Sequence, residues 1–344
     1  MNTRPSFFQF TPRLLAVALL LSGCASPGIR ITVGDKPEDV TSLDANTIAA
    51  SCGNLGGWSG DRRGVYIMWP TSDAAIRDNG PALIMLRGLK VHGMCKHGSD
   101  DLLVLAHDGG RTDIYKINPA SKTESLWCKG IPLNLNDLVA GVDGKVYAVS
   151  SFGVSLAGMW KYLVHSGDNL VIEAAPDGTY HIIATGISMG AGIAVCGDKL
   201  LVSSCRDYGV YAVDMHTGGE KHPVASNLGL VDNINVDPHD ENVFYVASHN
   251  SSLGLFTPFF RGSQVWRLQV GKSDDGWPRL VKLSRLCNLP DSRLVSNATP
   301  DEKGRLFIGH NRGTSVEIIE HPVFEDVTVS KHMKTAVSSG ATTR

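Results

Sequence analysis

The stretch GDKLLVSSC (197–205) decides the fold of this chain, because it is one of five copies of the same sequence phrase. Each copy is a turn residue followed by an apolar run, and a second short strand-like segment comes after it. The copies are DDLLVLAH (100–107), DGKVYAVSS (143–151), GDKLLVSSC, DENVFYVASH (240–249) and EKGRLFIGH (302–310), followed by TDIYKI (112–117), LVIEAA (170–175), GVYAVD (209–214), QVWRLQV (264–270) and SVEIIE (315–320). Repeats built only from short strands are typical of a β-propeller.

One further strand is expected before each phrase, running toward the propeller axis. The expected first strands are EDVTSL (38–43), HGMCKH (92–97), NDLVAGV (136–142), AGIAVC (191–196), DNINVD (232–237) and SNATPD (296–301). A weaker repeat, with NTIAAS (46–51) and GVYIMW (64–69), completes an all-β, six-bladed β-propeller over residues 36–324. A β-sandwich is the alternative, but sandwich strands do not recur with this self-similarity. Residues 24–35 are expected to be a linker and residues 325–344 a polar tail.

Composition narrows the class of partner. The 344 residues carry a formal net charge of -2 and no long basic run, so nucleic acid is not an expected partner. An apolar content of 42% is enough for a sizeable core. Seven Cys are present, and six remain once Cys24 is set apart. Disulfides and buried free thiols both stay open for these six.

The first 23 residues are expected to be a targeting segment. Two arginines precede the apolar run LLAVALLL (14–21), which is too short to span a bilayer. The run ends in Leu21-Ser22-Gly23-Cys24, which resembles the bacterial lipobox, where the Cys is acylated and becomes the mature N-terminus. Ala25 resembles the pattern sorted to the outer membrane in Gram-negative bacteria. We therefore expect lipidation of Cys24 and a lipid-anchored protein of the bacterial cell envelope, on the outer membrane and facing the periplasm.

Polar doublets open three of the first strands: Glu38-Asp39, Asn136-Asp137 and Asp232-Asn233. In a propeller these positions meet at one mouth of the central channel. Carboxylate and amide oxygens converging there would bind a hard cation, and the mixture favours Ca²⁺ over Zn²⁺ or Mg²⁺. A single Asp or Asn before a strand is more often a turn cap. The metal prediction therefore depends on the recurrence of doublets at matching positions.

Two histidines are placed for chemistry beside such a cation. His92 opens its first strand in Val-His-Gly, and His107 ends the next strand in Leu-Ala-His-Asp. The hairpin between them is short, so both side chains are expected near one face of the same blade. Imidazole titrates near neutral pH, which suits general-base catalysis.

Four segments of the chain resemble the paraoxonases, six-bladed propeller lactonases and arylesterases that hold two calcium ions in the central tunnel. They are PEDV (37–40), VHGM (91–94), LNLNDLVA (133–140) and LVDNINVDP (230–238). The last two are close to the wording of that family, and the resemblance runs from about residue 36 to about residue 310.

The resemblance implies a role for each matching residue. A catalytic Ca²⁺ would be held by Glu38, Asn136, Asp232 and Asn233, and a structural Ca²⁺ by Asp39, Asp137 and the main-chain carbonyl of Met94. His92 would be the base that activates water, and His107 its partner in a dyad.

The chain also departs from the family pattern. Ala191 stands where a further calcium-ligating Asn is expected, and Ser150-Ser151 where an acid would orient the second histidine. No Cys follows Cys287, so the family's disulfide between the chain ends has no counterpart. A weakened catalytic calcium site is the expected consequence.

The leading hypothesis is a calcium-dependent arylesterase or lactonase, a hydrolase of carboxylic esters whose substrate is a small-molecule ester or lactone. The protein would contact the membrane, its other expected partner, through the N-terminal lipid. The alternative is a non-catalytic, lipid-anchored propeller with structural calcium that serves as a binding or scaffold protein. A third possibility is the gluconolactonase branch, with one metal and sugar lactones, which the doublets and two histidines fit less well.

Overall fold

The computed structural model describes residues 29–34, 36–53, 62–68, 83–141, 143–152, 167–249, 262–287, 289, 294–311 and 313–328. The predicted signal segment with its lipobox Cys24, and residues 329–344 of the predicted tail, lie outside the described residues. No helix in the described ranges is long and apolar enough to cross a membrane.

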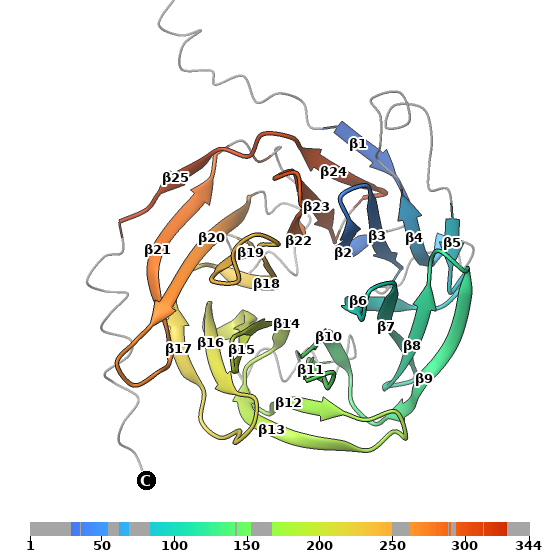
Figure 1. Ribbon diagram of the computed structural model, residues 1–344, viewed down its shortest axis with the longest axis horizontal. Helices are drawn as coiled ribbons and strands as arrows, with labels where there is room; N and C mark the ends of the chain where they lie inside the picture. Colours follow the sequence, from blue (N-terminus) through green and yellow to red (C-terminus); the bar gives the residue numbers. More distant parts are fainter. Residues whose placement is uncertain are drawn as a thin grey trace, which may run out of the picture.

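Six antiparallel sheets form the blades of a propeller around one axis, which confirms the all-β, six-bladed prediction (Figure 1). Blade one contains β2 (Pro37–Asp44), β3 (Thr47–Cys52), β4 (Gly64–Met68) and β5 (Leu83–Met85). Blade two contains β6 (Val91–His97), β7 (Asp101–Asp108), β8 (Arg111–Asn118) and β9 (Thr123–Ile131). Blade three contains β10 (Leu135–Ala140), β11 (Val146–Ser150), β12 (Asn169–Ala174) and β13 (Tyr180–Ile187). Blade four contains β14 (Gly190–Cys196), β15 (Lys199–Ser204), β16 (Gly209–Asp214) and β17 (His222–Ala225). Blade five contains β18 (Leu230–Val236), β19 (Val243–His249), β20 (Ser263–Lys272), β21 (Pro278–Leu286) and β25 (Phe324–Asp326). Blade six contains β22 (Val295–Pro300), β23 (Leu306–His310), β24 (Ser315–Ile319) and β1 (Ile29–Thr32). A 3₁₀ turn, Cys205–Asp207, follows β15.

The repeated apolar runs are the second strands of the blades, and they are buried on both faces. Every residue of β15 and of β19 is buried. A strand that packs on both faces needs a continuous apolar run instead of an alternating one. The repeated phrase in the sequence has this physical origin.

The core lies between the blades. Each of six apolar clusters joins two neighbouring blades, and together they close a ring. Ile67 of β4 shares a cluster with Val104 of β7, and Leu105 on the opposite face of β7 shares the next cluster with Ala148 of β11. Each second strand is therefore held by the blade before it and the blade after it.

The N-terminal strand β1 closes the ring, so the expected linker over residues 24–35 was wrong for part of its length. β1 pairs antiparallel with β24, and Arg30 Nε lies 2.7 Å from Glu317 Oε1. Ile31 is buried in the cluster between blades six and one, beside Val40 and Ile48. Four residues containing an Arg and a Thr are too short and too polar to indicate a strand by pattern alone.

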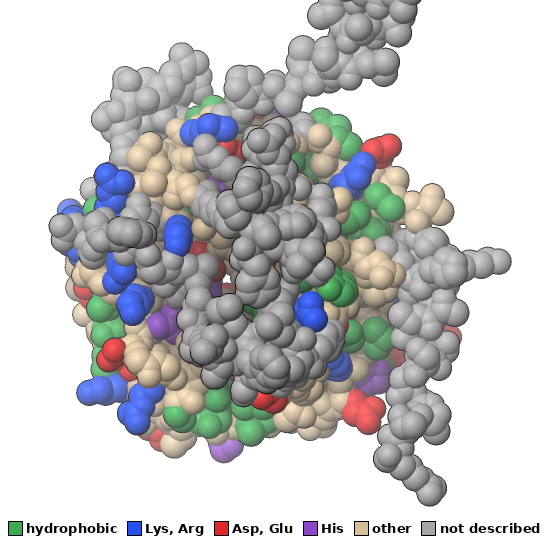
Figure 2. Space-filling view, turned by 180° about the vertical axis from the view of Figure 1, so that it is seen from behind, with side chains coloured by type: hydrophobic (Ala, Val, Ile, Leu, Met, Phe, Trp, Pro, Cys, Tyr) green, Lys and Arg blue, Asp and Glu red, His purple; other side chains and the backbone are tan. Residues whose placement is uncertain are grey.

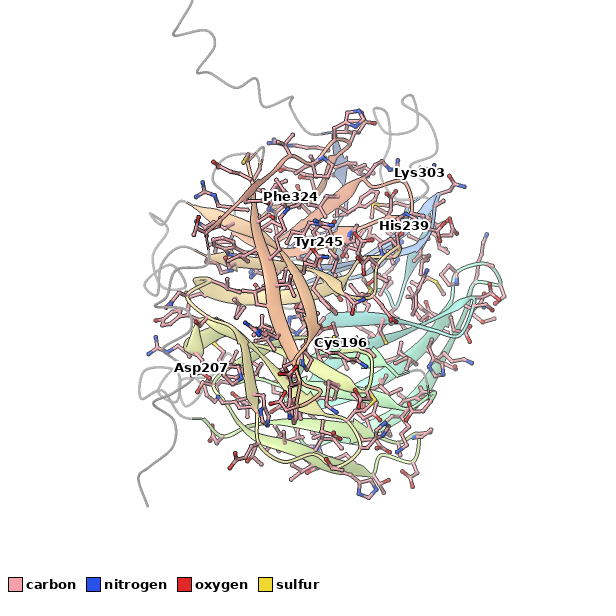
Figure 3. The ribbon with its side chains drawn as sticks, turned by 60° about the vertical axis from the view of Figure 1, so that its left-hand side comes forward. Cys196, Asp207, His239, Tyr245, Lys303 and Phe324 are labelled. Carbon is pink, nitrogen blue, oxygen red and sulfur yellow. The ribbon has the colours of Figure 1, made fainter. Side chains whose placement is uncertain are left out.

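The predicted start of the polar tail at residue 325 was also too early. β25 pairs antiparallel with β21 at the outer edge of blade five, and Val327 N donates to Leu283 O. The Phe324 ring meets the Tyr245 ring edge-on, with centroids 5.8 Å apart (Figure 3).

No disulfide joins any two of the six cysteines in the described ranges. Five are buried and Cys287 is exposed. Of the two possibilities that the sequence left open, thiols and not disulfides are found for these residues.

Because β1 closes the ring, truncating its buried side chain should loosen the whole propeller. We expect Ile31→Ala to lower the free energy of unfolding by about 2–5 kcal/mol, the usual loss for a buried aliphatic side chain. Val281→Ala is the control, because Val281 is 63% exposed; we expect a change within about 0.5 kcal/mol there. Urea unfolding measures both, and equal losses for the two variants would contradict closure by β1.

Candidate active site

The first strands begin, and the second strands end, on one face of the propeller, which we call the mouth. In Figure 3, Asp207, in the turn after β15, lies on one face, and His239 and Lys303, in turns before second strands, lie on the other. The mouth is therefore the face that carries Asp207.

Figure 2 shows the molecule from behind the view of Figure 1, with Lys and Arg side chains gathered toward one side.

Every first strand carries a register shift at the mouth. The shifts lie at Pro37/Asp39, Val91/Met94, Leu135/Asp137, Gly190/Ile193, Val231/Ile234 and Val295/Asn297. A bulge bends a strand and re-aims its side chains. The polar doublets predicted from the sequence coincide with these bulges, in blades one, three and five.

Glycines in two of the remaining blades let these strands approach closely. A Cβ on Gly93 would lie 2.7 Å from Asn136 O and from Asp137 Cα. A Cβ on Gly192 would lie 2.5 Å from Ile234 N. Blades two and four therefore present bare backbone to the doublets of blades three and five.

A hydrogen bond connects the doublets of blades one and five across the hub. Ser296 Oγ donates to Glu38 O at 2.6 Å, and Asn233 Nδ2 reaches the same carbonyl at 3.5 Å. Asn233 belongs to blade five and Glu38 to blade one, with blade six between them. The hub is therefore narrow enough for a side chain of one blade to reach the backbone of a non-adjacent blade.

The predicted ligands of the catalytic calcium lie around this hub. Glu38 and Asn233 are buried, whereas Asn136 and Asp232 are partly exposed. Asn136 Nδ2 donates to Gly190 O at 3.1 Å, which leaves the amide oxygen as the group that Asn136 can offer a cation. Asp232 Oδ2 accepts from Asn311 Nδ2 at 3.2 Å.

Backbone N–H groups hold the two predicted carboxylate ligands of the structural calcium, and a threonine hydroxyl bonds to the predicted carbonyl ligand. Asp39 Oδ2 accepts from Met94 N at 2.6 Å, and Asp137 accepts from Leu138 N and Ile193 N at 2.8 and 3.0 Å. The Met94 carbonyl, the predicted ligand, accepts from Thr41 Oγ1 at 3.4 Å. Each of these oxygens has a second lone pair, so the bonds fix the groups without using all of their capacity.

Burial of acids at the hub creates a demand for positive charge. Burial raises the pKa of Asp39 to about 7 and the pKa of Asp137 well above its usual value. The Glu38 carboxylate adds to the upward shift of Asp39, and the Asp39 carboxylate adds to that of Asp137. Burial also raises the pKa of Asp232, against the lowering effect of His249. The acids that share this hub repel one another, and a bound cation is the usual compensation for such a cluster.

The donor chemistry fits Ca²⁺ better than a softer metal. Among the described residues, no three His, Cys, Asp or Glu side chains are arranged to hold a metal. The candidate donors are mixed, with carboxylates from Glu38 and Asp232 and amides from Asn136 and Asn233. Oxygen donors of mixed type suit calcium, which tolerates irregular shells.

At the first-strand position of blade four that matches the doublets stands Ala191, whose side chain has no donor atom for a metal. Ala191 is buried and packs in a small apolar cluster with Cys205 and Leu230. Ala191, where this sequence departs from the paraoxonase pattern, thus makes an apolar contact in the structure.

The two predicted catalytic histidines are in contact, and one of them touches a predicted ligand. His92 Nε2 lies 3.0 Å from Glu38 Oε1, and His92 Nδ1 lies 3.4 Å from His107 Nε2. The ring centroids are 5.4 Å apart. The structure therefore forms a continuous line from Glu38 through His92 to His107.

Thr112 extends this line, and the sequence prediction missed it. Thr112 Oγ1 lies 3.3 Å from His107 Nδ1 and is fully buried. Thr112 is the direct register partner of His107 across the β7–β8 hairpin. The short Asp108–Arg111 turn is the sequence signal that could have paired them.

The surroundings push the pKa values of the two histidines in opposite directions. Burial lowers the pKa of His107 to about 3, helped by His92 and Lys90. Burial also lowers the pKa of His92, but the carboxylates of Glu38, Asp232 and Asp39 together outweigh it, and the net shift is upward. The surroundings thus favour a proton on His92 and oppose one on His107.

Two more histidines end second strands at the mouth. His249 Nε2 lies 3.4 Å from Asp232 Oδ2, and His310 Nε2 lies 3.6 Å from Glu317 Oε2. Neither histidine was assigned a role from its sequence position, and of the two only His249 contacts a predicted ligand.

Comparison with known proteins supports the fold alone. No protein-family profile and no curated protein sequence matches this chain. Similar solved structures include a proposed gluconolactonase (17% identity, TM-score 0.52, covering 88% of this chain and 92% of that one) and a calcium-binding regucalcin from Agrobacterium tumefaciens C58 (12%, 0.51, 87% and 92%). A PQQ-bound aldose sugar dehydrogenase from Streptomyces coelicolor is similar too (12%, 0.53, 88% and 97%). The resemblance to paraoxonases stays a prediction.

The neutral state of His107 makes stability depend on pH in a defined window. The unfolded ring takes up a proton below about pH 6.5, whereas the folded ring does so only near pH 3, so acid favours unfolding between these values. From pH 8 to pH 5 this one group should cost the folded state about 2 kcal/mol.

We expect His107→Gln to lose less stability than the native chain over that pH range. Urea unfolding at pH 8 and pH 5 measures the difference for both proteins, and all groups common to the two cancel. An identical pH slope for both would contradict the neutral assignment of His107.

Proposed function

We propose that this protein is a calcium-dependent hydrolase of carboxylic esters, with lactones as its main substrates. The observation that carries the proposal is the line of Glu38, His92 and His107 at the mouth, where a buried imidazole stands between a predicted calcium ligand and a second, neutral imidazole. General-base hydrolysis needs a basic nitrogen beside a site that stabilises negative charge.

The chain's own residues supply the proton chemistry. His92 Nε2, which faces Glu38, takes a proton from the attacking water. His92 Nδ1 faces His107 Nε2 at 3.4 Å, and this contact stabilises the imidazolium that forms. Ca²⁺ held by Glu38, Asn136, Asp232 and Asn233 would supply Lewis-acid stabilisation for the charge on the carbonyl oxygen.

The second proposed calcium has a structural role. Asp39, Asp137 and the Met94 carbonyl come from the first strands of blades one to three. An ion between them would offset the buried acids and tie those strands together. Because Ala191 has no side-chain ligand, a water or a neighbouring carbonyl would complete the coordination shell of the catalytic calcium on the side of blade four. Calcium binding would be weaker as a result.

The similar propellers are consistent with this substrate class. One is a proposed gluconolactonase and another a calcium-binding regucalcin. Sugar lactones therefore belong among the substrates to be tested, beside aryl esters and acyl lactones.

The test measures hydrolysis of phenyl acetate, γ- and δ-lactones and gluconolactone, with calcium, with EGTA and with calcium restored. We expect EGTA to abolish activity and calcium to restore it. His92→Gln should lower kcat by about 10²–10⁴-fold, the usual contribution of a general base. His181→Gln, at an exposed position of β13, is the matched control and should be neutral. Activity that ignores EGTA would contradict the calcium role, and full activity in His92→Gln would contradict the base.

The apolar contact of Ala191 favours one alternative, a propeller that uses calcium structurally and binds a partner protein. Calcium binding to the purified protein, with no hydrolysis across the whole panel, would select this alternative.

We also propose that a lipid on Cys24 anchors the protein to the bacterial outer membrane. Propeller strand β1 begins at Ile29, only five residues after Cys24, so an anchor there would hold the domain close to the membrane. We expect Cys24→Ser to lose palmitate labelling and to leave the membrane fraction, while Cys287→Ser, which changes an exposed thiol, keeps both. Labelling that survives in Cys24→Ser would contradict the anchor.

A further inference from the structure

The hydroxyl of Thr112 has three partners, and one of them determines the direction of the other bonds. Thr112 Oγ1 lies 2.7 Å from Leu133 O, 3.1 Å from Leu135 N and 3.3 Å from His107 Nδ1. A backbone carbonyl can only accept, so the single hydroxyl proton goes to Leu133 O. The hydroxyl oxygen then accepts from Leu135 N–H, and His107 Nδ1 must be the donor in the remaining bond.

The direction of this bond fixes the tautomers of both histidines. A neutral imidazole carries one ring proton, so His107 with its proton on Nδ1 has a lone pair on Nε2. That lone pair faces His92 Nδ1 at 3.4 Å, and His92 Nδ1 must therefore carry a proton. With Nδ1 protonated, the proton that His92 gains or loses is the one on Nε2, which faces Glu38 Oε1 and the hub.

We propose that Thr112 is the positioning residue of the histidine dyad: its hydroxyl holds His107 in the Nδ1–H tautomer and so makes His92 Nε2 the reactive nitrogen. This inference rests on the proposed hydrolase function for its catalytic meaning. A neutral hydroxyl here does the orienting work that the paraoxonase resemblance assigns to an acid, in whose place this chain has Ser150-Ser151.

The same hydroxyl ties the dyad to the calcium ligands. Leu135, whose N–H it accepts, directly precedes the doublet Asn136-Asp137 in β10. The carbonyl of Leu133 lies in the connection between β9 and β10. Thr112 thus fixes the side chain of His107 in blade two and the entry of the first strand of blade three.

Charge around His107 supports a neutral ring. The charged groups that act most strongly on it are His92, Glu38 and Lys90, and burial together with two of the three opposes protonation. Asp108 and Arg111, in the same hairpin, are exposed. A neutral ring is the state that a tautomer lock needs.

The direct test is the ¹⁵N spectrum of the histidine rings in the ¹⁵N-labelled protein near pH 7.5, with His107 assigned by comparison with His107→Gln. We expect a protonated Nδ1 and an unprotonated Nε2 at His107. A proton on Nε2, or on both nitrogens, would overturn the proposal. This measurement needs neither an active enzyme nor a Thr112 variant that folds.

Two variants test the catalytic consequence. Thr112→Val keeps the shape and removes the hydroxyl, so it should change the His107 tautomer and lower kcat by about 10–10²-fold with KM within about twofold, a loss short of removing the base itself. Thr112→Ser restores the hydroxyl and should keep the native tautomer and most of the activity. Ser284→Ala, which removes a buried hydroxyl bonded to Asp326 in blade five, is the control for stability and should leave kcat unchanged.

The outcomes separate the two proposals. A native Nδ1–H tautomer in a protein that hydrolyses nothing supports the lock while the hydrolase proposal fails. An unchanged His107 tautomer in folded Thr112→Val overturns the lock, even if the native protein is an active esterase.

Discussion

The close meeting of six first strands at the axis is the constraint on which the rest of this structure depends. A bulge in every first strand aims its residues at the hub, and glycines in blades two and four remove the side chains that would hold the strands apart. In the narrow space that results, polar residues of blades one and five are brought into contact, and those of blade three bond to the backbone of blade four. The Asn233–Glu38 contact between non-adjacent blades shows how little space remains.

That geometry sets the electrostatics and hence the chemistry. Carboxyl groups buried together are costly unless a positive charge joins them, and the pKa shifts of Asp39, Asp137 and Asp232 express this cost. A calcium ion would relieve it and would place a Lewis acid beside His92. The same burial keeps His107 neutral, so the ring can accept a hydrogen bond from His92. Fold stability and proposed catalysis are thus linked through one group of side chains.

The fold could be predicted from the sequence for the strands whose buried pattern recurs in every blade. It could not be predicted for an element that is buried in one place only. The expected first strands begin within two residues of β2, β6, β10, β14, β18 and β22, because strands held on both sides impose the same apolar phrase each time. β1 was missed because a short outer strand with one buried face leaves almost no pattern. The His92–His107 contact was predictable from the hairpin, but Thr112 was not singled out. Its role depends on three bonds to distant backbone and side-chain atoms, which a single Thr does not indicate.

A crystal structure of the protein grown with calcium, with anomalous data, tests the central claim most directly. We predict a peak on the propeller axis within about 2.3–2.6 Å of oxygens from Glu38, Asn136, Asp232 and Asn233. An axis without such a peak at saturating calcium, with these side chains still hydrogen-bonded only to one another and to the backbone, would contradict it.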